Sequence, residues 1–224
     1  MIELEARPES IRIDPARTAV IVVDMQNAFG SPGGMFDKVG IDIRAIQGTV
    51  APTRAVVEAA RREGIRIVYL KMGFQADLSD LGAEDVPNGA LFLNIGVKDG
   101  VLTRDTWATD ILDELAPRPG DTVIYKTRFS GFYRTDLDAI LGSWGTKHLI
   151  VTGCTTSVCV ESTIRDAFFR DYHCVLLEDC TAEPLGAQFD RSNHDATVFL
   201  VESNFGSVST STALIDAVTA VAST

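Results

Sequence analysis

One segment constrains the fold more than any other: the run TAVIVV at Thr18–Val23, which is followed at once by Asp24. An unbroken run rich in β-branched residues is typical of a strand that is buried on both faces of a parallel sheet. Further short apolar runs lie at Ile65–Leu70, Thr122–Tyr125, Leu149–Val151 and Cys174–Leu177. Together these runs predict five strands of one sheet.

Segments with apolar residues at helical spacing separate the predicted strands. Asp42–Arg62 is such a segment, and Gly48 and Pro52 predict a break near its start. Glu63-Gly64 predicts its end. Other helices are predicted near Trp107–Leu115, from Thr135 through Leu141, after Cys159, and from about Ser211 to Val221. Strands that alternate with helices predict a doubly wound α/β fold with a parallel sheet, here as a single domain over residues 1–224.

Composition excludes several classes of partner. The formal net charge of −11 and the pI of about 4.7 create a field that repels phosphate backbones and anionic lipid, so nucleic acid is not expected as a partner. The apolar runs are about as long as strands, and the N-terminal MIELEARPES is acidic, so we expect neither a membrane span nor a signal peptide. Four cysteines without a CxxC pair fit a reducing cytoplasm.

The stretch from Lys71 to Arg104 is much longer than the usual connection in a compact domain. It contains five glycines and no sustained hydrophobic period. Such a stretch is usually a functional loop or an assembly surface.

Three reactive side chains follow predicted strands: Asp24, Lys126 and Cys159. In an open α/β sheet, ligands bind beyond the carboxyl ends of the strands, so these side chains are expected at one edge. Cys159 should lie in the first turns of a helix, where free N–H groups and the helix dipole favour a thiolate.

Each of these residues also has an ordinary interpretation. Asp24 fits a loop or capping residue, Lys126 a solvated strand end, and Cys159 a buried cysteine. The occurrence of all three at one edge favours a site.

The segments that carry these residues resemble a known family. VDMQNAF at Asp24, KTRFSGFYRTDLDAIL from Lys126, and TGCTTSVCVESTIRDAFFRDY around Cys159 together resemble the isochorismatase-like cysteine hydrolases, and most of all their ureidoacrylate amidohydrolase and biuret hydrolase group. FGSVS at Phe205–Ser209 and LLEDC at Leu176–Cys180 also match that group. The resemblance implies a three-layer αβα, Rossmann-like fold with a mostly parallel six-stranded sheet, and a homodimer or homotetramer.

The resemblance also implies roles for individual residues. It implies a catalytic triad of Asp24, Lys126 and Cys159, in which the thiol attacks an amide carbon, Asp24 moves the proton, and Lys126 holds Asp24. It implies an oxyanion hole made by the backbone N–H groups of Thr155 and Cys159, with a cis peptide bond between Cys154 and Thr155.

A metal or other cofactor is not expected. Nicotinamidases with this fold have a histidine-rich metal site soon after the first aspartate, and this chain lacks it. Its histidines are far from Asp24 in sequence: His148 and His173 flank predicted strands, and His194 lies in a polar helical segment.

Candidate substrate-binding residues come from the segments around the triad. Phe29, Phe74, Phe132 and Tyr133 fit the walls of a small, mostly apolar pocket, or simply the core. Met72 stands where ureidoacrylate hydrolases have an asparagine, so one amide contact to a substrate is missing. Glu202 is placed like an acidic residue of the ureidoacrylate hydrolases and unlike the biuret hydrolase pattern, and it fits a solvated loop carboxylate equally well. A carboxylated substrate would need a cationic anchor, for which Lys71 and Arg128 are the candidates.

Two classes of function remain open from the sequence. The first is a metal-independent cysteine amidohydrolase that cleaves a C–N bond of a small linear ureide or carbamoyl compound, or of another small amide such as nicotinamide. The second is a catalytically silent member of the family that serves as a binding or assembly module. The presence of all three triad residue types favours the enzyme.

Overall fold

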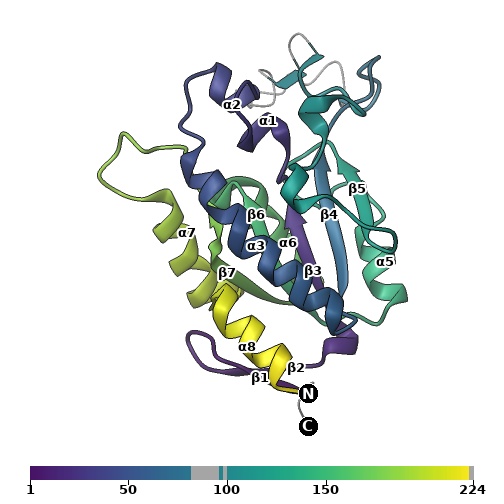
Figure 1. Cartoon of the computed structure of the whole chain (residues 1–224), viewed down its shortest axis with the longest axis vertical. Coiled ribbons are helices and arrows are strands. Elements are labelled where there is room, and N and C mark those ends of the chain that lie inside the picture. Colours follow the sequence, from purple (N-terminus) through teal and green to yellow (C-terminus); the bar gives the residue numbers. More distant parts are fainter. Residues whose placement is uncertain (82–95, 98–99, 222–224) are drawn as a thin grey trace.

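The computed structural model describes residues 1–81, 96–97 and 100–221 of the 224-residue chain. Its centre is a six-stranded, all-parallel sheet in the order β5-β4-β3-β6-β7-β8 (Figure 1). The strands are β3 (Thr18–Val23), β4 (Arg66–Met72), β5 (Thr122–Lys126), β6 (His148–Cys154), β7 (His173–Ala182) and β8 (Gly206–Ser209). From β3 the chain first adds strands on one side and then on the other, so the sheet has a switch point between β3 and β6.

Helices flank both faces of this sheet. They are α1 (Asn27–Gly30), α2 (Met35–Lys38), α3 (Arg44–Arg62), α5 (Leu137–Ser143), α6 (Glu161–Phe168), α7 (Asn193–Leu200) and α8 (Ser211–Val221). In Figure 1, α3 and α8 cross one face next to each other, while α6 lies behind the sheet. The predicted α/β class with a parallel sheet between helix layers is confirmed. Within the described residues, no helix is both long enough and apolar enough to cross a membrane.

Shorter elements complete the fold. Two short strands, β1 (Ile2–Leu4) and β2 (Ile11–Ile13), pair antiparallel outside the main sheet. The 3-10 helices are η1 (Pro15–Arg17), η3 (Trp107–Thr109) and η4 (Asp113–Leu115), and the π-helices are η5 (Thr156–Val160) and η6 (Val201–Phe205). The prediction of a single helix near Trp107–Leu115 is therefore wrong, because two short 3-10 helices, η3 and η4, occupy that segment.

The predicted break in the first long helix is also wrong. α3 runs through Gly48 and Pro52 without interruption. Its buried face, which includes Ile46 and Val56, packs against the sheet, and this burial outweighs the missing N–H of one proline. The predicted end at Glu63-Gly64 is confirmed, since Gly64 has a φ of 69°.

Two other boundaries and one strand differ from the prediction. β7 does not end before Glu178-Asp179, but continues to Ala182 after an irregular stretch between the pairs Val151↔Leu176 and Gly153↔Thr181. β8 was not predicted, because GSVS is short and lacks an apolar run. α5 begins at Leu137, and Thr135 accepts a hydrogen bond from the Leu137 N–H at 3.3 Å.

Gly153 permits the close approach of the two central strands. It has a φ of 111°, and a Cβ at this position would lie 2.0 Å from the carbonyl oxygen of Val23. Any side chain would therefore push β6 away from the end of β3, just before Asp24. Only glycine satisfies both the backbone angle and the contact.

This contact predicts that Gly153→Ala severely destabilises the protein. Gly120→Ala is a matched control, because Gly120 has a similar φ of 102° and a Cβ added there would meet no atom within 4 Å. The control should lose about 1–3 kcal/mol from backbone strain alone. Gly153→Ala should lose clearly more, or yield no folded protein, as measured by urea unfolding. Equal losses in the two variants would contradict the steric argument.

Candidate active site

Asp24 and Lys126 form a buried ion pair at the carboxyl edge of the sheet. Asp24 directly follows β3, and Lys126 is the last residue of β5, with Met72 of β4 as its register partner. The lysine side chain spans the end of β4, so that its Nζ lies 2.6 Å from Oδ2 of Asp24. Both side chains are at most 1% exposed. Nζ also donates to the carbonyl of Arg128 at 3.2 Å.

The backbone around Asp24 is held tightly. Asp24 has a positive φ of 49°, which places its side chain out of the regular strand path. Its N–H donates to the Leu70 carbonyl at 2.9 Å. The buried Gln26 then holds both backbone groups of Met72: its Oε1 accepts from the Met72 N–H at 2.7 Å, and its Nε2 donates to the Met72 carbonyl at 3.0 Å. The turn after β3 is thus fixed to β4.

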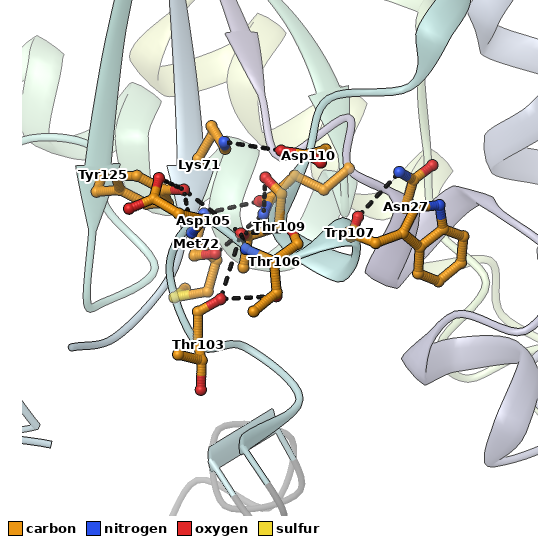
Figure 2. Close-up of polar contacts among 11 residues, drawn as sticks. Asn27, Lys71, Met72, Thr103, Asp105, Thr106, Trp107, Thr109, Asp110 and Tyr125 are labelled. Carbon is orange, nitrogen blue, oxygen red and sulfur yellow. Dashed lines mark hydrogen bonds and ion pairs between the residues drawn. The ribbon is translucent and has the colours of Figure 1, made fainter. Parts of the chain in front are cut away.

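A polar network extends this support outward from Met72, as Figure 2 shows. Nε2 of Gln26 also donates to the carbonyl of Thr109, and Nδ2 of Asn27 donates to the carbonyl of Trp107 at 2.9 Å. These bonds tie the first turn after β3 to η3. The network supports the site without contributing a reactive group to it.

Burial and the charge of the partner shift the pKa of each member of the ion pair in opposite directions. Burial raises the pKa of Asp24, and the neighbouring Lys126 ammonium opposes this rise. For Lys126 burial acts to lower the pKa, but the attraction and the hydrogen bond to the Asp24 carboxylate oppose burial, and the pKa of Lys126 is raised. The lysine therefore stays charged. Oδ1 of Asp24 is buried without a hydrogen-bond partner among the described residues, which leaves it able to accept a proton.

Cys159 lies in η5, directly after β6, and is 8% exposed. Burial raises the pKa of its thiol, and the negative charge of Asp24 adds to this effect, whereas Lys126 lowers the pKa. The balance favours the thiol. Burial thus opposes the resting thiolate that the helix terminus and the lysine favour. A thiol with a raised pKa needs a proton acceptor before its sulfur can attack, and the Asp24 carboxylate lines the same cavity.

A cavity of about 380 Å³ opens at this edge of the sheet. Most of its wall is apolar, and its polar side chains are few. The lining residues are Asp24, Phe29, Met35, Phe36, Met72, Leu102, Phe129, Cys154, Thr155, Ser157, Val158, Cys159, Leu185 and Asn193. A cavity of this size and polarity fits a small organic molecule held by a few directed hydrogen bonds.

The two residues predicted to form an oxyanion hole both line this cavity. The peptide bond between Cys154 and Thr155 is cis. Within the described part of the chain, the Thr155 N–H donates no hydrogen bond, while its carbonyl accepts from Val158 and Val160. The Cys154 thiol donates to the backbone carbonyl of Asp24 at 3.1 Å, so the second cysteine of the cavity supports the aspartate.

The structure separates the candidate substrate-binding residues into two groups. Phe29 and Met72 line the cavity. The other four do not. Phe74 is 1% exposed within the core, Phe132 stacks on Tyr172 with ring centroids 5.9 Å apart, Tyr133 is 38% exposed, and Glu202 forms an ion pair with Arg7 at 3.0 Å. Their side chains serve the core or the surface.

Neither candidate anion anchor lines the cavity. The side chain of Lys71 points to the face of β4 opposite Met72, where its Nζ lies 4.6 Å from the Tyr125 ring centroid and 3.8 Å from Asp110 (Figure 2). Arg128 donates to the carbonyls of Thr127 and Leu81. Both cations therefore have other partners.

Several lining residues were not singled out from the sequence. They are Met35, Phe36, Leu102, Phe129, Val158, Leu185 and Asn193. Leu102 belongs to the long stretch from Lys71 to Arg104, of which residues 82–95 and 98–99 lie outside the described residues. His194 also has a role that its sequence context did not indicate, because its Nδ1 lies 3.0 Å from the Thr156 hydroxyl in η5.

The described residues contain no group of three or more His, Cys, Asp or Glu side chains that could hold a metal ion. The cation at the site is Lys126. The donor set therefore differs from that of a metal centre.

Comparison with known proteins agrees with this geometry. Residues 18–213 match the isochorismatase domain. The chain is 40% identical to the ureidoacrylate amidohydrolase RutB of Rhizobium rhizogenes, over 93% of this chain and 86% of the relative. The chain belongs to the isochorismatase family.

Two solved structures resemble the protein. A cysteine hydrolase from Pseudomonas syringae pv. phaseolicola has a TM-score of 0.80 and 31% identity, and the match covers 93% of this chain and 95% of the other. The N-carbamoylsarcosine amidase of Thermoplasma acidophilum has a TM-score of 0.66 and 26% identity, over 87% and 96% of the two chains. The isochorismatase-family membership predicted from three sequence segments is thus confirmed.

The buried ion pair predicts a pH effect for Lys126→Met. Asp24 acts as a base only when ionised, and loss of the lysine removes the charge that opposes the rise of its pKa. The acid limb of the kcat/KM profile should therefore move to higher pH, and the protein should lose about 3–5 kcal/mol of stability, as for other broken buried pairs.

Lys71→Met is the control for this prediction. Lys71 is also a mostly buried lysine, at 8% exposed, but its ionic partner is Asp110. Its loss should leave the acid limb in place. An unchanged limb in Lys126→Met, or an equal shift in both variants, would show that Lys126 does not control Asp24.

Proposed function

We propose that this isochorismatase-family hydrolase is a metal-independent cysteine amidohydrolase that cleaves a C–N bond of a small linear ureide or carbamoyl compound. The observation that carries the proposal is the buried Asp24–Lys126 pair beside Cys159 in a small apolar cavity. Two similar proteins are named for ureidoacrylate and N-carbamoylsarcosine, and both of these compounds contain a carbamoyl group.

The first half of the reaction forms a covalent intermediate. Sγ of Cys159 attacks the carbamoyl carbon and gives its proton to Asp24, so that a C–S bond forms as the carbonyl oxygen becomes negative. Backbone N–H groups of Thr155 and Cys159 stabilise this oxyanion. The tetrahedral intermediate then expels the amine, which takes the proton from Asp24, and a thioester, or an S-carbamoyl group for a ureide, remains on the enzyme.

The second half returns the enzyme to its starting state. Asp24 takes a proton from water as the water oxygen attacks the thioester carbon. The C–S bond breaks, and the proton passes to the sulfur of Cys159. The product is a carboxylic acid, or a carbamate that loses CO2. Lys126 stays charged throughout and keeps Asp24 oriented toward the sulfur.

This proposal predicts that Cys159→Ser lowers turnover by at least about 1,000-fold while the protein remains folded, because a neutral hydroxyl is a much weaker nucleophile. Ammonia release and intact-protein mass spectrometry of the acyl-enzyme measure the effect. Cys174→Ser is the control, since Cys174 is also buried but does not line the cavity. Near-normal activity of Cys159→Ser would disprove covalent catalysis, whereas a wild type inactive on every small amide and ureide would favour a binding module.

The charge of the cavity favours an uncharged substrate over a carboxylated one. Its described lining includes no lysine or arginine, and Lys126 is fully paired with Asp24. Lys98 is the one lysine or arginine of the sequence that lies outside the described residues. A buried carboxylate without a cationic partner is costly, so a neutral ureide such as biuret fits this lining better than ureidoacrylate.

We therefore expect kcat/KM for biuret to exceed that for ureidoacrylate by at least about 10-fold, the lower value for one missing charge-assisted hydrogen bond. Parallel ammonia-release assays at one pH measure the ratio. Lys98→Ala provides the internal check and should leave the ratio unchanged. If the wild type prefers ureidoacrylate and Lys98→Ala loses this preference, Lys98 is an anion anchor and the proposal of a neutral substrate is rejected.

A further inference from the structure

The turn that carries the candidate oxyanion hole is bound by one carboxylate. Ser157 lies midway between Thr155 and Cys159, the residues whose N–H groups face the reaction in the proposed function. Oε2 of Glu183 accepts two hydrogen bonds from Ser157, one from its N–H at 2.8 Å and one from its hydroxyl at 2.5 Å. The same side chain therefore fixes both the backbone and the side chain of the middle residue.

The other oxygen of Glu183 binds another part of the cavity wall. Oε1 accepts from the N–H of Leu185 at 2.9 Å. The carbonyl of Leu185 in turn accepts from Nδ2 of Asn193 at 3.0 Å. Ser157, Leu185 and Asn193 all line the cavity. Glu183, which directly follows β7, thus connects the Cys159 turn to a second segment of the cavity wall.

Physical chemistry explains why a carboxylate is useful at this point. The first N–H groups of η5 have no partner within the helix, and a carboxylate near a helix N-terminus forms strong charge-assisted bonds to such groups. An oxyanion hole works only if its donors are already in place when the negative charge develops. An anchored Ser157 limits the motion of the N–H groups on both sides of it.

We propose that Glu183 is a positioning residue of the active site, which holds the Thr155–Cys159 turn in the geometry that stabilises the oxyanion. This proposal rests on the proposed function, because it assigns the residue to that reaction. Glu183 itself need not touch the substrate. The contact between Thr156 and His194 holds the same turn from α7 and adds to the effect.

The chain contains a matched pair of residues away from the site. Asp179 of β7 binds Ser211 at the start of α8 in the same way: Oδ1 accepts from the Ser211 N–H at 2.8 Å, and Oδ2 accepts from its hydroxyl at 2.5 Å. Neither residue lines the cavity. Asp179→Ala therefore removes the same kind of capping contact without touching the proposed turn.

The experiment compares Glu183→Ala, Glu183→Gln and Asp179→Ala in two reactions of Cys159. Acylation by p-nitrophenyl acetate passes through an oxyanion, whereas alkylation by iodoacetamide displaces iodide at a carbon and forms none. We expect Glu183→Ala to slow acylation about 10- to 100-fold with alkylation changed less than about 2-fold. Glu183→Gln should lie between it and the wild type, since one amide oxygen can still accept from Ser157.

Thermal unfolding and the control variant decide between positioning and general stability. Asp179→Ala should lower Tm by an amount similar to Glu183→Ala and leave acylation unchanged. Equal slowing of acylation and alkylation in Glu183→Ala, or unchanged acylation, would overturn the proposal, as would equal slowing by Asp179→Ala. Because the test uses an activated ester, a wild type that acylates but releases no ammonia from ureides refutes the proposed function alone.

Discussion

The active site depends on an ion pair that water does not reach. Asp24 and Lys126 come from strands that are not neighbours, and their side chains meet at 2.6 Å with almost no exposure. Two buried charges lose their hydration, and only a close, fixed partner compensates for this loss. The surrounding fold provides that fixation, since Gln26 and Met72 hold the aspartate turn and the Arg128 carbonyl accepts from the lysine. A buried ion pair therefore requires surrounding residues that hold its two members in fixed positions.

The position of the pair also explains the state of the nucleophile. The burial that strengthens the Asp24–Lys126 pair also raises the pKa of Cys159 and so favours its thiol form. Oδ1 of Asp24, which has no hydrogen-bond partner among the described residues, provides the acceptor for the thiol proton. In the proposed reaction, the thiol is therefore activated during attack and not beforehand. A protonated cysteine in an apolar cavity is also less exposed to oxidants than a permanent thiolate.

Sequence patterns were sufficient where a single physical rule dominates. TAVIVV predicted a buried parallel strand, and the shared edge of parallel strands predicted that Asp24, Lys126 and Cys159 lie at one edge of the sheet. The patterns failed where tertiary contacts decide. β8 depends on pairing with β7, α3 continues through Pro52 because its other residues are buried, and Glu202 is held by Arg7. The cavity wall from Leu185 and Asn193 depends on a hydrogen bond across a loop, which leaves no periodic signal in the sequence.

Leu185 and Asn193 form a part of the cavity wall that lies on a different segment from the reactive residues. The reactive residues sit on strand ends and the adjoining turn, whereas this section of wall belongs to a loop that is closed by its own hydrogen bond and is bound by Glu183. Loops of this kind accept insertions and exchanges more readily than strands. Replacement of residues 184–192 between relatives is therefore a practical route to new substrate shapes on an unchanged chemical framework, provided that Glu183 and Asn193 are kept as the points of attachment.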